Sequence, residues 1–426
     1  MSTEARTTTH PRRVLPPAEL PERPDVPRAL IAGAGISGLT VAHGLARHGW
    51  DVQLFEAAPT PRGGGYMIDF FGPGYDTAER MGAVLPEMRA HGKEFRELRY
   101  VDEQTRITAR ADVDAIVAGV GGRYFSILRP DVERSLLATL PDRVAVAYGH
   151  RVADLDLAAA DHGDHVHVTT RTATGETRTW QGDLLVGADG IRSRVRELAW
   201  GPEDYFLRHL GYRSAAYLFE DPELARWLGD TPLLTDTLHR QAGLYAVDER
   251  TAATLFIERT DEVDRPVDVA AHWRTRFDDL GPTIRRALAV APADMYCDSV
   301  AQSVVPRWRR GRVVLTGDAA HAVSLLAGQG VSMAITGGWH LGGLVGPLAT
   351  DGVPTADALG RAIDRYQDGF GPQVAGVQRT APTAAATFCP GNRAQLALRR
   401  LAVNATALPG AGALAGRLAG GRRVVG

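Results

Sequence analysis

The first hydrophobic pattern of the chain consists of two short apolar runs separated by a helical one. Residues 28–32 and 51–56 have the composition of buried strands. Between them, residues 36–48 place small and apolar side chains on one side of a helix: Leu39, Ala42, Leu45 and Ala46. The helical pattern ends near Gly49. The succession predicts a βαβ unit with a right-handed crossover.

The middle of the chain has mostly strand-type patterns. Predicted strands cover residues 95–102, 106–109, 123–128, 212–219, 243–247 and 253–258, and residues 165–180 alternate around a hairpin turn at Thr174-Gly175. Helices are predicted from Arg129, with Pro130 in the first turn, and over residues 269–279. An apolar strand follows at 313–316, a helix begins at Val331, and helical patterns continue to about residue 403. This order predicts an α/β fold: a Rossmann-type domain with an inserted mixed α+β domain dominated by a β-sheet.

Composition narrows the class of protein. A chain of 426 residues predicts two or three domains, and its net charge of −2 lacks the basic footprint of a nucleic-acid-binding protein. Cys297 and Cys389 are far apart and have no metal-ligand spacing, so we expect no metal site and a reducing, cytoplasmic setting. No apolar stretch is long enough to span a membrane. Residues 1–27 are polar and proline-rich, which predicts a disordered leader, and the glycine-rich C-terminal tail is predicted to be flexible.

The turn between the first strand and the first helix carries a glycine motif. Gly33-x-Gly35-x-x-Gly38 supplies a tight turn, close approach of the backbone to a pyrophosphate and close packing of helix on strand. Glu56 ends the second strand, where a carboxylate can accept hydrogen bonds from both ribose hydroxyls. A carboxylate there disfavours a 2′-phosphate. The predicted ligand is therefore NAD-like or FAD-like in its adenosine half.

Two further strand ends favour a flavin over a nicotinamide dinucleotide. Residues 184–190 form a strand that ends at Asp189-Gly190, and residues 313–318 form another that ends at Asp318. Each turns into a helical pattern. A flavin dinucleotide extends from an adenine to a tricyclic ring, and three separate loops match that length better than one.

These motifs resemble those of the single-component (group A) flavoprotein aromatic hydroxylases, the para-hydroxybenzoate hydroxylase-like family. The resemblance rests on GAGISG with Glu56, on GADGIRSRVR and on GRVVLTGDAAHAVSLLAGQG. It implies an FAD-binding domain made of residues 28–69, 126–204 and 301–345, and a substrate domain made of residues 70–125 and 205–300. Residues 346–426 would form a C-terminal helical region with its tail.

The resemblance also implies roles for individual residues. The proposed FAD-binding set is Gly33, Gly35, Ile36, Ser37, Gly38, Glu56, Gly64, Gly65, Arg129, Asp189, Asp318, Gly328, Gly330 and Val331. Asp318 would accept hydrogen bonds from the ribityl hydroxyls, and the helix that starts at Val331 would face the pyrimidine end of the flavin ring. His321 is interpreted as a structural residue of the turn. Arg213 and Tyr212, on a strand of the substrate domain, are the candidate substrate contacts.

The family chemistry implied is oxygenation by FAD. NADPH or NADH, bound transiently, would reduce FAD, and O₂ would form a flavin C4a-hydroperoxide that oxygenates an aromatic or polyketide-like small molecule. Hydroxylation, epoxidation and Baeyer–Villiger insertion remain open as outcomes, as does a non-catalytic FAD-binding carrier. A flavin halogenase is disfavoured because Lys93 is the only lysine and no WxWxIP segment is present. No catalytic residue is assigned, and we expect a monomer or homodimer.

Two positions depart from the family pattern. Leu325 stands where the family usually has proline, and the following helix contains Gly337-Gly338 where an acidic residue is usual. Glycine inside a helix destabilises it by roughly 0.5–1 kcal/mol relative to alanine. The sequence offers no reason for the glycine pair.

Overall fold

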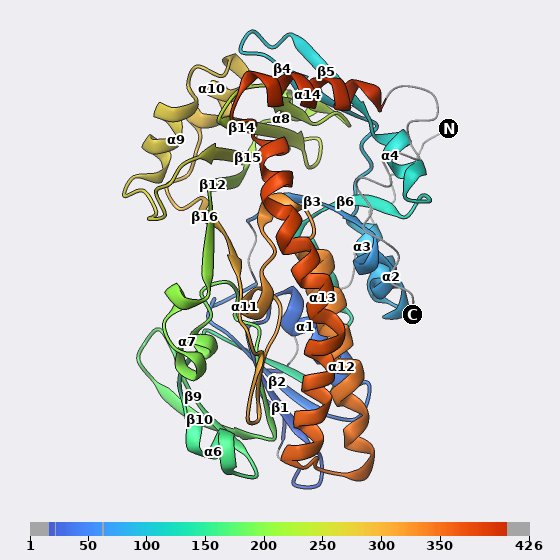
Figure 1. Ribbon diagram of the computed structural model, residues 1–426, viewed down its shortest axis with the longest axis vertical. Helices are drawn as coiled ribbons and strands as arrows, with labels where there is room; N and C mark the ends of the chain where they lie inside the picture. The colour runs from blue at the N-terminus through green and yellow to red at the C-terminus, as the bar shows by residue number, and fades with distance from the viewer. Residues whose placement is uncertain (1–16, 22, 62–63, 407–426) are drawn as a thin grey trace, which may run out of the picture.

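The computed structural model describes residues 17–21, 23–61 and 64–406. Two regions lie one above the other along its long axis, and the helix α13 (Ala356–Phe388) runs past both of them (Figure 1). Most of the predicted leader and the C-terminal tail lie outside the described residues. The mixed α/β architecture with a Rossmann sheet and a second sheet confirms the predicted fold class.

The lower region contains a six-stranded sheet in the order β17-β18-β11-β1-β2-β7. Its strands are β1 (Arg28–Ala32), β2 (Asp51–Glu56), β7 (Val144–Tyr148), β11 (Leu184–Gly187), β17 (Arg309–Arg310) and β18 (Val313–Leu315). All neighbours are parallel except β17 and β18. The central strands are buried on both faces, which explains their continuous apolar sequences. The predicted bounds of β1 and β2 are confirmed.

The upper region contains a seven-stranded sheet in the order β16-β12-β15-β14-β13-β4-β5. Its strands are β4 (Glu97–Val101), β5 (Ile107–Asp112), β12 (Leu207–Glu220), β13 (Leu233–Thr235), β14 (Arg240–Ala246), β15 (Thr251–Arg259) and β16 (Tyr296–Ser303). One face packs against α8 (Pro222–Leu228), α9 (Val269–Phe277) and α10 (Pro282–Ala289) in a separate apolar core. The other face is turned toward the lower region. The sheet therefore separates a structural core from a face that can contribute to a site.

Smaller elements complete the fold. The hairpin predicted at Thr174-Gly175 is confirmed within the sheet of β8 (Arg151–Leu155), β9 (Val166–Arg171) and β10 (Thr177–Gly182), and β3 (Met67–Phe71) pairs with β6 (Tyr124–Leu128). The remaining α-helices are α1 (Ile36–Ala46), α2 (Pro73–Arg80), α3 (Val84–Ala90), α4 (Val113–Gly119), α5 (Arg129–Ala138), α6 (Leu157–His162), α7 (Arg194–Trp200), α11 (Asp318–His321), α12 (Gly330–Val345) and α14 (Arg393–Ala405). Short 3₁₀ helices are η1 (Glu203–Tyr205), η2 (Leu325–Ala327) and η3 (Gly346–Asp351).

Two predicted boundaries are corrected by packing. The ordered chain begins before residue 28, because the carbonyl of Pro17 accepts a hydrogen bond from the N–H of Val146 (2.9 Å) and Leu20 is buried. Helices α2 and α3, predicted in the substrate domain, share the apolar core of the Rossmann sheet through Tyr75, Val84 and other side chains. Their amphipathic sequences could not reveal which of two neighbouring cores they would cover.

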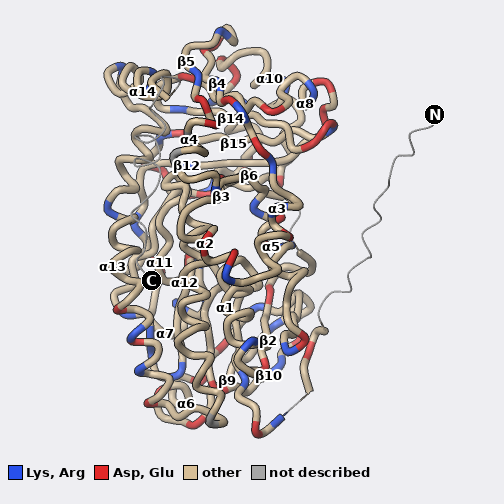
Figure 2. The backbone as a smooth tube through the Cα atoms, turned by 90° about the vertical axis from the view of Figure 1, so that its right-hand side faces the viewer, with Lys and Arg blue, Asp and Glu red and all other residues tan. Residues whose placement is uncertain are grey.

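The glycine pair of α12 is explained by helix packing. Figure 2 shows α12 between α1 and α13. A Cβ at Gly342 would lie 2.7 Å from the Cα of Gly44 in α1, and a Cβ at Gly338 would lie 2.9 Å from the carbonyl oxygen of Ser37. On the other side, a Cβ at Gly337 would lie 2.7 Å from the ring of Phe370 in α13. The glycines allow α12 to approach both neighbours closely, and this packing fixes the start of α12 relative to the start of α1.

Gly342→Ala is therefore expected to destabilise the protein although alanine favours helices. We expect the free energy of unfolding to fall by about 1–3 kcal/mol, as for other overpacked sites. Gly343→Ala is the matched control in the same helix, since a Cβ there meets nothing within 4 Å. It should raise stability by roughly 0.5–1 kcal/mol through helix propensity. Urea unfolding measures both, and equal effects of the two variants would contradict the close helix contact.

Candidate functional site

The three glycine-containing turns identified in the sequence meet in the structure. A Cβ at Gly33 would lie 2.4 Å from the carbonyl oxygen of Ala188, so the first and second motifs are in contact. A Cβ at Gly317 would lie 2.6 Å from the Cβ of Ser37, so the third motif touches the start of α1. The Ser37 hydroxyl also lies 3.4 Å from that of Thr316. The carboxyl ends of β1, β11 and β18 thus form one site.

The glycines of the first motif have different structural tasks. Gly33 adopts φ +97°, and a Cβ at Gly38 would lie 2.0 Å from the carbonyl oxygen of Gly33. Gly33 requires glycine for its positive φ, and Gly38, inside α1, requires it because the turn passes too close for a side chain. Gly35 is different, because its φ is −79° and the nearest atom to a Cβ would be Glu133 Oε1 at 3.7 Å. Gly35 precedes the eleven-residue helix α1, whose first turn, with Ile36 and Ser37, offers N–H groups to an anion.

Glu56 and Tyr148 lie side by side at the ends of β2 and β7. The Glu56 carboxylate accepts hydrogen bonds from the N–H groups of Ala34 (3.1 Å) and Ala58 (2.9 Å), and a carboxylate has further acceptor positions for a ribose. The Tyr148 hydroxyl is buried and has no partner among the described residues. Burial raises the pKa of Tyr148 to about 12, with Glu56 adding to the effect. A buried, neutral hydroxyl beside Glu56 suits a polar ligand.

Two charged side chains, Arg129 and Asp318, form a second polar cluster. Arg129, at the start of α5, forms an ion pair with Glu133 (3.0 Å). Asp318 is accessible to solvent, yet surrounding protein raises the pKa of its carboxyl group, and only Arg129 opposes that shift. Gly65 is close by, because a Cβ there would lie 2.8 Å from the Pro130 ring. Arg129 and Asp318 therefore lie within electrostatic reach of each other, and we call the solvent-accessible part of the protein around these two residues the recess.

Asp189 is engaged by the helix that follows it. Its carboxylate accepts hydrogen bonds from the N–H groups of Arg194 (2.7 Å) and Val195 (3.1 Å) and from the hydroxyl of Ser193. Asp189 thus caps α7, and its backbone packs against the turn at Gly33. Any contact of its side chain with a cofactor must use the remaining acceptor positions.

The start of α12 has open space around its glycines. Gly328 adopts a left-handed conformation (φ +66°), and a Cβ at Gly328 or Gly330 would meet nothing within 4 Å. The N–H groups of the first turn, from Gly330 and Val331 onward, have no partner within this helix. They give this end of the sixteen-residue helix a partial positive charge. Leu325, which stands in the place of the family proline, begins η2.

His321 holds the third turn in place. Its ring Nε2 accepts a hydrogen bond from the N–H of Gly317 (3.2 Å) and lies 3.0 Å from the Tyr366 hydroxyl, which is also 3.0 Å from Thr316 Oγ1. The ring is buried, and burial lowers the pKa of His321 to about 4. The imidazole is therefore neutral at physiological pH. Its contacts fit the structural role predicted from the sequence.

The folded protein should lose stability as the pH falls because of His321. Its folded-state pKa of about 4 lies below the ordinary value of 6.5, so the unfolded chain binds more protons between these values. Above pH 6.5 the protonation of His321 does not reduce the free energy of unfolding. By pH 4.5 it should lower that free energy by about 2–3 kcal/mol. Urea unfolding of wild type and His321→Gln at pH 7.5 and 4.5 measures the effect. An equal pH dependence in the two proteins would contradict it.

The two candidate substrate residues face opposite sides of the upper sheet. Tyr212 packs with Leu326 and Ile257 on the face turned toward the third motif. Arg213, the next residue of β12, points to the other face, where its guanidinium is 1% exposed and paired with Glu258 (2.9 Å). It also donates to the carbonyl of Asp264 (2.8 Å). Arg213 is therefore held by contacts within its own region, and Tyr212 packs beside Leu326 of the third motif.

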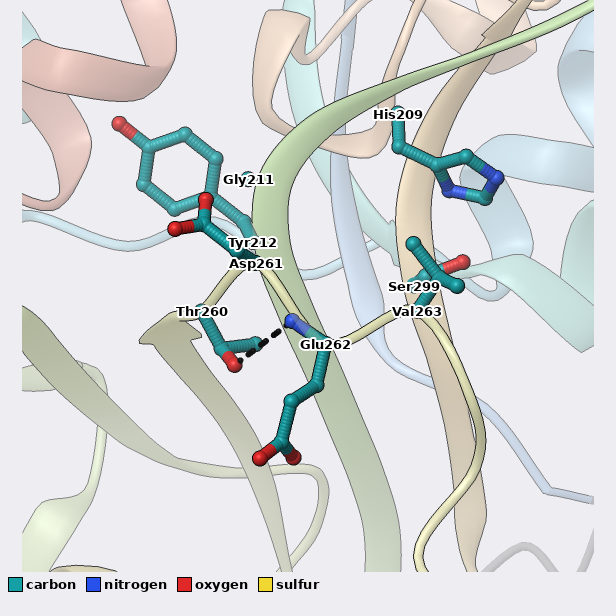
Figure 3. Close-up of a pocket in the computed structure, with 8 residues that line it drawn as sticks. All are labelled: His209, Gly211, Tyr212, Thr260, Asp261, Glu262, Val263 and Ser299. Carbon is teal, nitrogen blue, oxygen red and sulfur yellow. Dashed lines mark hydrogen bonds between the residues drawn. The ribbon is translucent and has the colours of Figure 1, made fainter.

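A small surface pocket lies apart from the three motifs. It forms beside the bulge of β12, and Figure 3 shows the polar side chains of His209, Asp261 and Glu262 around it. Apart from Tyr212, none of the predicted site residues lines it. We assign it no part in the site.

Comparison with protein families decides the identity of the site. A family model described as "FAD binding domain" matches residues 27–346. The chain belongs to this family of FAD-dependent monooxygenases. The match covers all three motifs and both regions of the fold. The predicted family resemblance is confirmed.

Individual relatives agree with this assignment. The chain is 32% identical to the uncharacterized protein Rv1260 of Mycobacterium tuberculosis over 356 residues, which cover 80% of this chain and 87% of that one. It is 30% identical to the 3-amino-4-hydroxybenzoate 2-monooxygenase PtnB3 of Streptomyces platensis, with 83% and 86% covered. The crystal structure of the tetracycline destructase Tet(55) matches with a TM-score of 0.72 and 25% identity, over 91% and 98% of the chains. Of these three proteins, PtnB3 is by its name a monooxygenase of an aromatic compound, 3-amino-4-hydroxybenzoate.

The residues of the site fit FAD. The helix start at Gly35 suits a pyrophosphate, Glu56 and the unpartnered Tyr148 hydroxyl suit an adenosine ribose, and the recess with Asp318 suits a polyol chain. A Cβ at Gly35 would come no closer than 3.7 Å to its nearest neighbour, Glu133 Oε1, so the helix start is not crowded by protein atoms. Among the described residues, no helix is long and apolar enough to cross a membrane.

Sequence reasoning missed Tyr148, and it also missed Tyr66 and Tyr296, which the fold brings within electrostatic reach of Arg129. Tyr148 ends an apolar run, Val144–Tyr148, that has the composition of a third Rossmann strand. This apolar run could have predicted a strand that ends at Tyr148. Tyr66 and Tyr296 come from segments far apart in the chain, and no local pattern connects them.

Proposed function

We propose that this protein uses FAD, NADPH or NADH, and O₂ to oxygenate an aromatic or polyketide-like small molecule. Bound FAD supplies the redox chemistry: it takes up two electrons from the nicotinamide nucleotide and activates oxygen. The observation that carries the proposal is the convergence of three strand-end turns on one recess between a nucleotide-binding domain and a second β-sheet. A hydroxylation is the expected outcome, with epoxidation or Baeyer–Villiger insertion as alternatives on the same fold.

The lower region would bind and orient the cofactor. The N-terminus of α1 would hold the pyrophosphate, Glu56 the adenosine ribose and Asp318 the ribityl hydroxyls. Arg129 lies near Asp318 and contributes positive charge to the recess. The N-terminus of α12 would stabilise negative charge that develops on the reduced ring, by roughly 0.3–2 kcal/mol.

The upper sheet would position the substrate over the cofactor. Tyr212 and the apolar residues around it face the loop that contains Leu325 and Leu326. An apolar cover of this kind keeps water from the reacting atoms, which favours transfer of oxygen to the substrate over side reactions. Aromatic substrates agree with the names of the relatives, one of which acts on 3-amino-4-hydroxybenzoate.

Purified protein loaded with FAD tests the proposal. We expect a panel of aromatic and polyketide compounds to contain at least one that accelerates NAD(P)H oxidation and yields a product heavier by one oxygen atom, labelled when ¹⁸O₂ is supplied. FAD bound without any stimulated NAD(P)H oxidation would favour the non-catalytic carrier. A protein that cannot be loaded with FAD would overturn both.

A further inference from the structure

Two tyrosines from different parts of the fold meet at the recess. Tyr66 lies between Gly65 and β3, and Tyr296 is the first residue of β16 in the upper sheet. Their ring centroids are 6.0 Å apart. Tyr296 remains 41% exposed, although surrounding protein raises its pKa above the ordinary value. Both rings are therefore partly accessible to solvent while lying against each other.

The position of Tyr66 connects this pair with the proposed flavin site. Arg129 and Asp318 both act electrostatically on Tyr66, and burial raises the pKa of Tyr66 to about 12. Its phenol is therefore neutral at physiological pH. Among the described residues, its hydroxyl makes no hydrogen bond, so it can both donate and accept one. Tyr296 also lies within the electrostatic reach of Arg129 and of Asp298, and its hydroxyl interacts with the Ser214 side chain, which leaves it one further hydrogen bond to make.

The charges around the pair do not favour a carboxylate ligand. Arg129 is the cation that acts on both tyrosines, and its guanidinium is held by Glu133 at 3.0 Å. Asp318 adds a second carboxylate on the same side. Arg213, the cation that sequence reasoning assigned to the substrate, lies on the opposite face of the sheet and is paired with Glu258. An anionic substrate would meet more negative than positive charge here.

We propose that the hydroxyls of Tyr66 and Tyr296 bind an oxygen or nitrogen of an uncharged aromatic substrate, and that the site discriminates against aromatic carboxylates. This inference rests on the proposed function, because it takes the recess beside the flavin as the substrate site. Two neutral phenols can donate to a carbonyl or phenolic oxygen and accept from a hydroxyl or amine. The preference for uncharged ligands over carboxylates comes from the carboxylates around the two tyrosines. A negative ligand would lose its hydration there without gaining an unpaired cation.

Ligand titrations of the FAD-loaded protein, without NAD(P)H, test this inference. The probes are matched pairs: 4-hydroxybenzamide with 4-hydroxybenzoate, salicylamide with salicylate, and 3-amino-4-hydroxybenzamide with the corresponding acid. The change in flavin absorbance measures Kd for each. We expect the amide of a pair to bind at least about tenfold more tightly than the acid. Tenfold in Kd corresponds to about 1.4 kcal/mol, the order of magnitude of one unfavourable contact between like charges. Acids that bind equally or better, or amides that leave the flavin spectrum unchanged, would overturn the inference.

Single variants test the two hydroxyls. Tyr66→Phe and Tyr296→Phe should each raise the Kd of the amides by about 2–12-fold, the effect of one hydrogen bond, while FAD content remains that of wild type. Tyr205→Phe is the control, because Tyr205 is 77% exposed on the surface. Unchanged amide binding in both site variants would contradict the assignment. An amide preference without NAD(P)H oxidation by any compound would leave this inference standing and defeat the proposed function instead.

Discussion

Gly38→Ala is expected to weaken FAD binding strongly and to destabilise the apoprotein. The new Cβ would lie 2.0 Å from the carbonyl oxygen of Gly33, so either the turn or the helix α1 must move. Overpacking of this kind usually lowers the free energy of unfolding by about 1–3 kcal/mol, and displacement of the turn should weaken FAD binding at least about 100-fold. Urea unfolding of the apoprotein and quenching of FAD fluorescence measure the two effects.

Gly35→Ala separates the two effects. Its Cβ would come no closer than 3.7 Å to Glu133 Oε1, and its φ of −79° suits alanine. We therefore expect the apoprotein to keep its stability within about 0.5 kcal/mol. FAD binding should weaken by roughly tenfold, because the methyl group extends to where the pyrophosphate is proposed to bind. If Gly35→Ala bound FAD as wild type does, the pyrophosphate could not lie against this turn.

Arg213→Met is expected to lower the free energy of unfolding by about 3–5 kcal/mol, the usual effect of removing one partner from a buried ion pair. Arg213 and Glu258 are each 1% exposed, and their closest nitrogen and oxygen are 2.9 Å apart. Arg276 also binds Glu258, at 3.0 Å, so some compensation remains. The loss should therefore be near the lower end of this range, as measured by urea unfolding.

A second substitution provides the control for Arg213. Arg213→Met combined with Glu258→Leu removes the carboxylate that Arg213 had balanced, and an apolar pair should recover part of the lost stability. If Arg213 anchored the substrate, as the sequence suggested, Arg213→Met would instead raise KM and leave unfolding unchanged. Comparison of the two properties in one variant therefore distinguishes a structural from a substrate-binding arginine.

The sequence alone determined the nucleotide-binding part of this protein. The strands β1 and β2, the helix start at Gly35 and the acid at Glu56 lie within 29 consecutive residues, 28–56, where short-range periodicity and turn chemistry are informative. The three motifs were also identified as parts of one site. This was possible because parallel strands in a Rossmann sheet bring their carboxyl ends to the same edge.

Only the tertiary structure decided which side chains share a face or a core. Tyr212 and Arg213 differ by one position, and their roles depend on which face of the sheet meets the lower region. The glycine pair of α12 has a reason only once α1 and α13 lie against it. The meeting of Tyr66 with Tyr296 joins segments 230 residues apart. Such contacts depend on long-range packing of whole elements, which no local pattern of hydrophobic and polar residues encodes.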